Sequence, residues 1–302
     1  MGWVGPRAYG TLLALAASVA LGGCNRAAPH ADHPQMAPGV VLRDVTFESA
    51  SLHRSMPYRV MLPANVSPGQ RLPVVYLLHG RDDDFRSWSN AAPVSRLAAR
   101  GYLLVMPEGY YTYYANSATF ARDRYEDYIT ADLVRDVESR FPAADSGPTA
   151  RRAIVGVSMG GVAAIALAFH HPAEYGFAGA LSPALDVPSR PFLVKRFTQS
   201  VTFLKIFGPL GSATRMAYDP FRQAAVADPG TLPFVWFSCG DEEPLLAPSQ
   251  RFAALLAARH IAFVFHPASG AHNWSQWSGQ LPLLLAALTE HVPASPPVRP
   301  AP

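Results

Sequence analysis

The sequence predicts an α/β fold, with a mostly parallel central sheet and helices on both of its faces. The first observation is a set of short, nearly continuous apolar runs at residues 72–78, 102–107, 153–155, 177–182 and 232–240. Such runs are typical of strands that are buried on both faces of a parallel sheet. The second observation is that helical segments separate these runs, and this alternation is what a right-handed, parallel α/β sheet requires.

The remaining elements follow from local patterns. Residues 41–47 and 58–62 are two strand candidates joined by polar residues, a pattern typical of a hairpin. A further short strand is expected at residues 261–266. Helices are expected at residues 88–99, 124–141, 161–168 and 249–259, and a final helix is expected to begin near Trp274 and Trp277.

Composition limits the class of protein. The chain has 302 residues, of which 49% are hydrophobic and 16% charged, so it can bury a sizeable core and global disorder is excluded. The net charge of +3 is small and dispersed, which argues against a nucleic-acid partner. We expect one principal domain at residues 41–292.

The two ends of the chain are expected to lie outside this domain. Residues 1–23 have the features of an export signal, with an apolar run at residues 12–21 that is too short to span a bilayer. This run ends in Leu-Gly-Gly-Cys, which resembles the bacterial lipobox. The resemblance implies that Cys24 is acylated, so that the exported chain is anchored in the cell envelope. An ordinary secretory signal is the alternative.

Residues 24–40 are expected to form a flexible tether and residues 293–302 a Pro-rich tail.

The sequence predicts no metal site and no cofactor. Only two cysteines are present, so a lipid on Cys24 leaves no intramolecular disulfide. Cys239 lies in an apolar strand and is expected to be a buried small side chain. No H-E-x-x-H motif and no cysteine pair occurs.

One serine has the context of a nucleophile. The sequence Gly156-Val157-Ser158-Met159-Gly160 matches the G-x-S-x-G nucleophile elbow, between an apolar strand and an Ala-rich helix. The small neighbours allow a turn tight enough to raise the hydroxyl above the sheet. The backbone N–H of Met159 then lies at a helix N-terminus, where it can stabilise a developing negative charge.

An acid and a base follow the serine in the order that α/β-hydrolases use. The acids Asp241, Glu242 and Glu243 follow one predicted strand, and His272 lies in a later Gly-containing loop. A serine hydroxyl needs a base to remove its proton, and a carboxylate must hold that base in the right tautomer. Spacing alone does not choose among the three acids.

Two other segments leave alternatives open. The tyrosine-rich loop at residues 108–120 is either an aromatic wall of a substrate cleft or a packed surface loop. The insertion at about residues 184–230 is apolar with scattered Lys and Arg. Helices packed on the core are its plainest interpretation, while a lid over the cleft and a basic segment that touches lipid are the alternatives.

At its motifs the chain resembles the putative esterase family of α/β-hydrolases, which includes esterase D, feruloyl esterases, enterochelin esterases and mycolyltransferases. The resemblance covers about residues 49–285. It rests on Met-Pro-Tyr-Arg-Val-Met-Leu-Pro at residues 56–63, Val-Tyr-Leu-Leu-His-Gly at 75–80, the elbow, and Gly-Ala-His-Asn-Trp-Ser-Gln-Trp at 270–277. The resemblance therefore implies an α/β-hydrolase fold, in which we expect the insertion at about residues 184–230 to be lid-like.

The resemblance also implies roles for single residues. Ser158 would be the nucleophile, His272 the base and Glu243 the acid, although most relatives have Asp at that place, which leaves Asp241 open. The backbone N–H groups of Met159 and Arg81 would hold the oxyanion.

We therefore expect a serine esterase that acts on a small-molecule or carbohydrate-linked ester. An acyltransferase and a non-catalytic surface protein are the alternatives. Pro183 stands where the family has glycine after Ser182, so the backbone path there is open to question.

Overall fold

The computed structural model describes Met1 and residues 31–144 and 152–294. The fold belongs to one compact unit, His33–Pro302. The expected export signal, Cys24 and most of the expected tail fall outside the described residues. None of the described helices is both long enough and apolar enough to cross a membrane.

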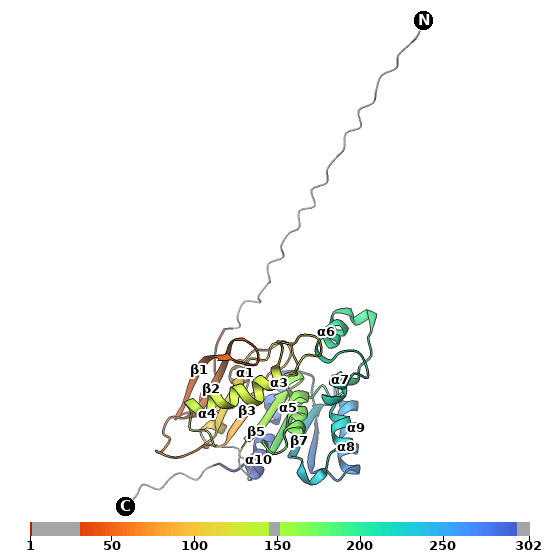
Figure 1. The fold of residues 1–302 in the computed structure, drawn as a ribbon. Coiled ribbons are helices and arrows are strands. Elements are labelled where there is room, and N and C mark those ends of the chain that lie inside the picture. The colour runs from red at the N-terminus through yellow and green to blue at the C-terminus, as the bar shows by residue number, and fades with distance from the viewer. Residues whose placement is uncertain (2–30, 145–151, 295–302) are drawn as a thin grey trace, which may run out of the picture. The chain divides into compact units, whose positions relative to one another are not determined.

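An eight-stranded sheet forms the centre of this unit, in the order β1-β2-β4-β3-β5-β6-β7-β8 (Figure 1). The β1–β2 hairpin is antiparallel and joins β4 antiparallel, whereas all pairs from β4 to β8 are parallel. The predicted fold class is thus confirmed. The strands are β1 Val40–Ser49, β2 Arg54–Pro63, β3 Val74–Leu78, β4 Leu103–Pro107, β5 Arg152–Val157, β6 Phe177–Leu181, β7 Phe234–Gly240 and β8 Phe263–Ala268.

Helices cover both faces of the sheet, as its buried strands require. Alternate residues of β3 point to opposite faces, so Val75 packs with Trp88 and Leu284 on one face while Tyr76 joins the larger core on the other. The first face is covered by α1 Ser87–Ala91, α2 Ser95–Ala98 and α10 Trp274–His291. The second is covered by α3 Tyr125–Asp127, α4 Leu133–Arg140, α5 Met159–His170, α8 Pro220–Val226 and α9 Leu246–Ala258.

Two expected helices differ from the prediction. The segment predicted as one helix at residues 88–99 forms α1 and α2, with Ala92 in an extended conformation between them. Proline at 93 explains the break, because it disfavours helical backbone at the residue before it. The helix predicted at residues 124–141 forms as α3 and α4, but the turn that joins them, Tyr128–Asp132, is π-helical.

The domain's contacts begin before residue 41. The backbone N–H of His33 donates to Asn90 Oδ1, and the N–H of Ala37 donates to Ser95 Oγ. Residues 33–37, which the sequence predicts to be part of a flexible tether, therefore pack against α1 and α2.

The insertion between β6 and β7 carries α6 Phe197–Phe207, α7 Ala213–Ala217 and α8. One side of α6 is buried through Phe203 and Phe207, whose rings contact Tyr113 edge-on. The buried guanidinium of Arg215 donates to the carbonyls of Pro188 and Gly208, which closes the insertion on itself. The insertion is thus packed on the core, as its plainest interpretation predicts.

A cluster of charged and aromatic groups joins the insertion to the elbow helix. The carboxylate of Glu126 in α3 accepts hydrogen bonds from His170 and His171 at the end of α5, and from the hydroxyl of Tyr218. Burial alone would raise the pKa of Glu126, but these three donors outweigh it and hold the pKa well below its usual range. At His170, burial alone would lower the pKa, but the carboxylate of Glu126 outweighs burial and raises it.

We predict that Glu126→Gln destabilises the fold most at mildly acidic pH. The depressed pKa of Glu126 contributes stability above its ordinary value of 4.5, and this contribution is lost as pH falls through the folded-state pKa. The raised pKa of His170 contributes stability below 6.5, which is lost as pH rises through the folded-state pKa. Thermal unfolding should show a loss of about 1–3 kcal/mol between these values and smaller losses on either side. Glu242→Gln, at an exposed position, is the control, and a loss that is equal at every pH would contradict the prediction.

Candidate active site

Ser158 lies on a strained turn between β5 and α5. Its φ of 53° is in the left-handed region, which residues other than glycine rarely adopt and which costs about 1–3 kcal/mol. The turn is possible because its neighbours lack side chains. A Cβ on Gly156 would lie 2.1 Å from the carbonyl oxygen of Gly160, and one on Gly160 would lie 2.4 Å from the carbonyl oxygen of Leu78. The backbone at the elbow thus forms the tight turn that Gly156 and Gly160 predict.

The serine, one of the three acids and the late histidine meet at the carboxyl edge of the sheet. His272 Nε2 lies 2.8 Å from Ser158 Oγ, and His272 Nδ1 lies 2.6 Å from Glu243 Oε2. Ser158 follows β5, Glu243 follows β7 and His272 follows β8, so three parallel strands bring them to one place. This is the arrangement in which a hydroxyl can lose its proton to an imidazole held by a carboxylate.

Asp241 lies elsewhere, although only one residue separates it from Glu243. Its Oδ1 accepts the backbone N–H of Gly270 at 2.9 Å, and its own N–H donates to the carbonyl of Ala268. Asp241 therefore shapes the loop that carries His272 and does not contact the imidazole. Glu242 is exposed.

The carboxylate of Glu243 is buried, and both of its oxygens are hydrogen-bonded. While Oε2 faces His272, Oε1 accepts the hydroxyl of Ser182 at 2.6 Å and the N–H of Gly240 at 2.9 Å. The Glu243 side chain has no exposed surface. Burial alone would raise its pKa, but the bonds from His272, Ser182 and Gly240 outweigh burial and lower the pKa. The group is therefore held as a carboxylate, the form that can orient an imidazole.

Ser182 and Trp277 are supporting residues whose contacts the sequence did not reveal. The indole N–H of Trp277 donates to Ser182 Oγ at 2.9 Å, and this fixes the hydroxyl that donates to Glu243. The Trp277 ring also meets the His272 ring edge-on, with centroids 5.0 Å apart. The backbone of Ser182 has a φ of 47°, and Ala184 N–H donates to the carbonyl of Ser158. The chain therefore turns at Ser182 and passes beside the elbow with Pro183 in place.

The loop after β3 carries the expected second oxyanion donor. Arg81 and Gly80 line the same cavity as Ser158, and no described residue accepts the backbone N–H of Arg81. Asp83 holds this loop, because its Oδ2 accepts the N–H of Gly80 and its Oδ1 accepts the indole N–H of Trp274. Asp83 thus ties the loop of Arg81 to the start of α10, two residues after His272.

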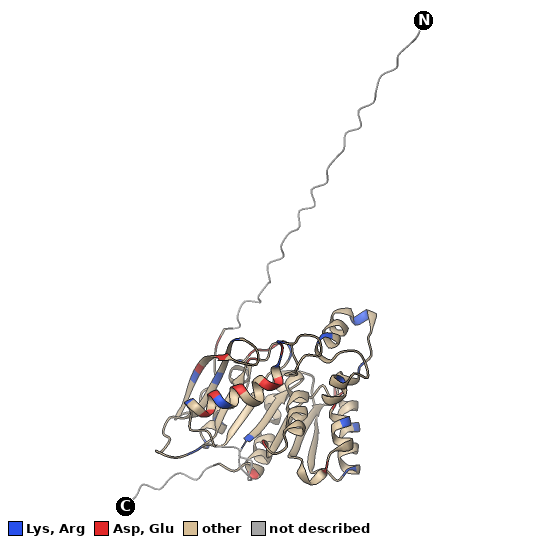
Figure 2. Cartoon of the chain, viewed as in Figure 1, with Lys and Arg blue, Asp and Glu red and all other residues tan. Residues whose placement is uncertain are grey.

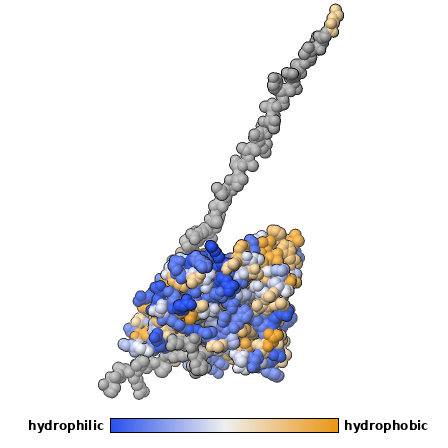
Figure 3. Space-filling view, in the orientation of Figure 1, coloured by the Kyte–Doolittle hydropathy of each residue, from blue (hydrophilic) through white to orange (hydrophobic). Residues whose placement is uncertain are grey.

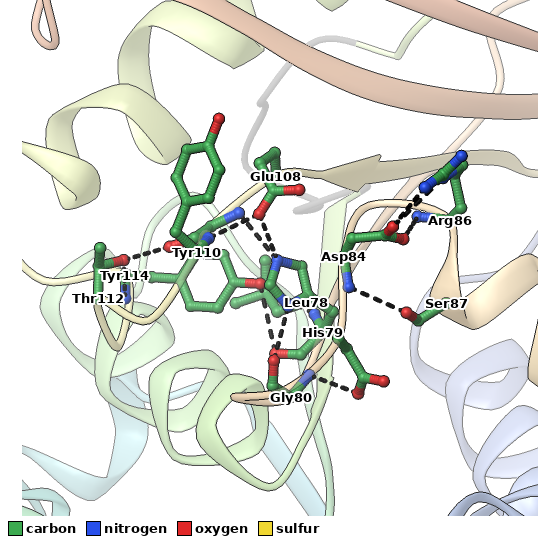
Figure 4. Close-up of polar contacts among 12 residues, drawn as sticks. Leu78, His79, Gly80, Asp84, Arg86, Ser87, Glu108, Tyr110, Thr112 and Tyr114 are labelled. Carbon is green, nitrogen blue, oxygen red and sulfur yellow. Dashed lines mark hydrogen bonds and ion pairs between the residues drawn. The ribbon is translucent and has the colours of Figure 1, made fainter. Parts of the chain in front are cut away.

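A buried histidine supports the same loop (Figure 4). His79 Nε2 accepts the N–H of Gly109 at 2.9 Å, which leaves Nδ1–H to donate to the carbonyl of Gly80 at 2.7 Å. The hydroxyl of Tyr114 accepts the N–H of His79 at 2.9 Å. His79 therefore shapes the loop and lies outside the proton path, because both ring nitrogens already have backbone partners.

The tyrosine-rich loop combines both interpretations that the sequence allows. Tyr113 lines the cavity, whereas Tyr114 is fully buried beneath it. Both have positive φ, at 54° and 53°, and Thr112 Oγ1 accepts the N–H of Tyr114 to stabilise the turn. One tyrosine thus faces the site while another holds the loop in place.

The cavity above Ser158 has a volume of about 540 Å³, within the usual range for small-molecule sites. Tyr113, Leu245 and Trp274 supply apolar surface, and Arg190, Arg196, Gln199 and Asn273 supply polar groups. No cluster of three or more potential metal ligands lies within the described ranges. Cys239 is buried, as predicted, and burial raises the pKa of its thiol to about 12.

Comparisons with known proteins agree with this geometry. The sequence model of a family described as "Putative esterase" matches residues 49–288, most of the chain. The chain belongs to the putative esterase family. The resemblance inferred from the motifs is thereby confirmed, and the protein is a member of an enzyme family of esterases and serine hydrolases.

Individual relatives span hydrolases and transferases. The chain is 26% identical over 295 residues to the diacylglycerol acyltransferase/mycolyltransferase Ag85A of Mycobacterium leprae, covering 86% of each chain. The fold is similar to FphF, a fluorophosphonate-binding serine hydrolase of Staphylococcus aureus (TM-score 0.70, 22% identity, 84% of this chain and 98% of that one). It is also similar to an S-formylglutathione hydrolase of Agrobacterium tumefaciens (TM-score 0.71, 19% identity, 86% and 98%).

We predict that Glu243→Gln lowers kcat/KM for a p-nitrophenyl ester by about 10³- to 10⁴-fold, because an amide cannot hold the imidazole tautomer or stabilise its cation. Asp241→Asn is the matched control and should cost less than about tenfold, since it alters only a loop contact. Steady-state kinetics with the two variants measure the difference. A larger loss at Asp241 than at Glu243 would contradict the assignment of Glu243 as the acid.

Proposed function

We propose that this protein is a serine carboxylic-ester hydrolase that works through an acyl-enzyme on Ser158. The observation that carries the proposal is the continuous hydrogen-bonded series Ser158–His272–Glu243 at the floor of an open cavity. No metal or cofactor is needed for this chemistry, because the hydroxyl, the base and the carboxylate are all supplied by the chain.

The proposed reaction has two halves. Ser158 Oγ attacks the ester carbonyl carbon while His272 Nε2 accepts its proton, and the tetrahedral oxyanion accepts the N–H groups of Met159 and Arg81. Each such donor is worth about 2.7–4 kcal/mol of the barrier. His272 then gives its proton to the leaving alkoxide as the acyl-enzyme forms. Water, deprotonated by His272, attacks that acyl-enzyme, and the acid is released with Ser158 restored.

The supporting residues have defined parts in this scheme. Glu243 stays ionised and accepts Nδ1–H throughout, so the imidazolium that forms twice per turnover is stabilised. Ser182 and the N–H of Gly240 keep that carboxylate in place. The cavity suits a small-molecule or carbohydrate-linked ester, and both apolar and polar surfaces are available to it.

Transfer of the acyl group to a sugar or lipid is the second candidate, favoured by the 26% identity with a mycolyltransferase over most of both chains. The two candidates share every step up to the acyl-enzyme and differ only in what attacks it. Turnover of a p-nitrophenyl ester with increasing diacylglycerol, the acceptor class in the relative's name, distinguishes them. A hydrolase yields the free acid at every diacylglycerol concentration, whereas a transferase yields the acylated acceptor at the expense of the acid.

We further propose that the chain is exported and anchored through acylated Cys24, on the basis of the lipobox-like sequence at residues 21–24. Labelling with radioactive palmitate in a bacterial host measures this, and the label should disappear in Cys24→Ala. Label retained in that variant would exclude the anchor.

We predict that Ser158→Ala lowers ester hydrolysis by about 10⁴-fold or more and abolishes labelling by a fluorophosphonate probe. Thermal stability should be nearly unchanged, because the hydroxyl's only side-chain partner in the described structure is His272. Ser139→Ala is the control for labelling, since it removes an exposed serine outside the site. Failure of the unmodified protein to label at Ser158 would favour a non-catalytic binding protein instead.

A further inference from the structure

The segment at residues 192–197, called the 192–197 loop below, leaves large apolar side chains in solvent. The exposed fractions are 45% for Phe192, 80% for Val194 and 61% for Phe197. Figure 3 shows hydrophobic surface gathered over α6 and the segment before it, at one corner of the molecule. A cluster of this kind on a soluble protein marks a surface that meets an apolar partner.

The charge around this loop has one sign. Residues 187–218 contain five Arg or Lys and no Asp or Glu. Arg190 pairs with Asp186, and Arg215 is buried among backbone carbonyls. Lys195, Arg196 and Lys205 are exposed, and none of them has an ion-pair partner within the described ranges. Figure 2 shows the same corner with basic but no acidic residues.

The loop is ordered although its apolar side chains face outward. Ser200 Oγ accepts the N–H of Leu193 at 3.0 Å and donates to its carbonyl at 3.2 Å, and Arg196 N–H donates to the same carbonyl. The rings of Phe192 and Phe197 meet edge-on, 6.0 Å apart. The N–H and carbonyl of Leu193 and the N–H of Arg196 thus have partners within the chain, which lowers the cost of placing these groups in an interface that offers fewer water partners.

The loop borders the cavity above Ser158. Arg196 and Gln199 line that cavity, while Phe203 and Phe207 fix the other side of α6 to the core. A surface that touched the 192–197 loop would therefore lie beside the mouth of the site.

We propose that the 192–197 loop docks the protein on an anionic phospholipid bilayer. Phe192, Val194 and Phe197 enter the interface, and the neighbouring basic groups pair with lipid phosphates. Basic charge beside exposed apolar side chains is what such a surface attracts. A second copy of the chain fits less well, because a two-fold interface would place these unpaired cations against one another. The proposal goes beyond the proposed activity and does not depend on it.

A fluorophore at position 194 tests the docking directly. The full chain carries Cys24→Ser and Val194→Cys, labelled with a polarity-sensitive NBD group, since the remaining Cys239 is buried. Val226→Cys is the matched control, because it is an equally exposed valine, at 83%, at the end of α8 and away from α6 in Figure 1. Vesicles of phosphatidylglycerol mixed with phosphatidylcholine should shift the emission to the blue at position 194 and leave position 226 unchanged. Vesicles of phosphatidylcholine alone should have a much smaller effect.

Charge reversal supplies the second arm. Lys195→Glu in the Val194→Cys background should weaken binding to the anionic vesicles by about fivefold or more, because each basic group near such a surface is worth about 1 kcal/mol. Thermal unfolding followed by circular dichroism, compared with and without this substitution, reports whether the fold is intact. The proposal is overturned if position 194 keeps its emission on anionic vesicles, even where the chain floats with them through another segment. Equal shifts at 194 and 226 also overturn it, and a shift without vesicles that grows with protein concentration assigns the loop to a second copy.

Discussion

The buried carboxylate of Glu243 is the constraint on which the site depends. Its two oxygens accept bonds from the end of β7, from Ser182 after β6 and from His272 after β8. A carboxylate with no exposed surface is costly unless it is hydrogen-bonded, so the three segments that supply its donors must pack together for it to be tolerated. The same interactions that keep it ionised also aim the imidazole at Ser158. Stability of this corner of the fold and readiness for catalysis therefore have one physical origin.

The strained backbone at the elbow also depends on the segments packed around it. A positive φ at Ser158 is unfavourable by itself, and it persists because β5 and α5 are packed on both sides and two glycines allow close backbone contact. The result is a hydroxyl raised toward the cavity with a helix N-terminus behind it. Three further residues with side chains, Tyr113, Tyr114 and Ser182, also have positive φ near the site. Unfavourable backbone is thus concentrated where the geometry is most constrained, as is usual for functional sites.

The insertion has two faces with different tasks. One face of α6 is part of the core and holds Tyr113 against the cavity. The other face, with the 192–197 loop, leaves apolar and basic side chains exposed. Ser200 holds the loop in this position through its two hydrogen bonds to the backbone of Leu193. The insertion thus borders the cavity on one side and carries the proposed docking surface on the other.

The sequence by itself determined the sheet, the elbow and the order of serine, acid and base. These are short-range properties: apolar runs mark buried strands, and G-x-S-x-G has few alternatives to a tight turn. Only the tertiary structure decided between Glu243 and Asp241, because both follow the same strand. Which acid contacts His272 depends on how β7 and β8 pair. It also depends on Gly270, whose N–H binds the Asp241 carboxylate and so holds it away from the imidazole. The contact between Ser182 and Trp277 could not be predicted for the same reason, since they are 95 positions apart in the sequence and no local pattern indicates that they meet.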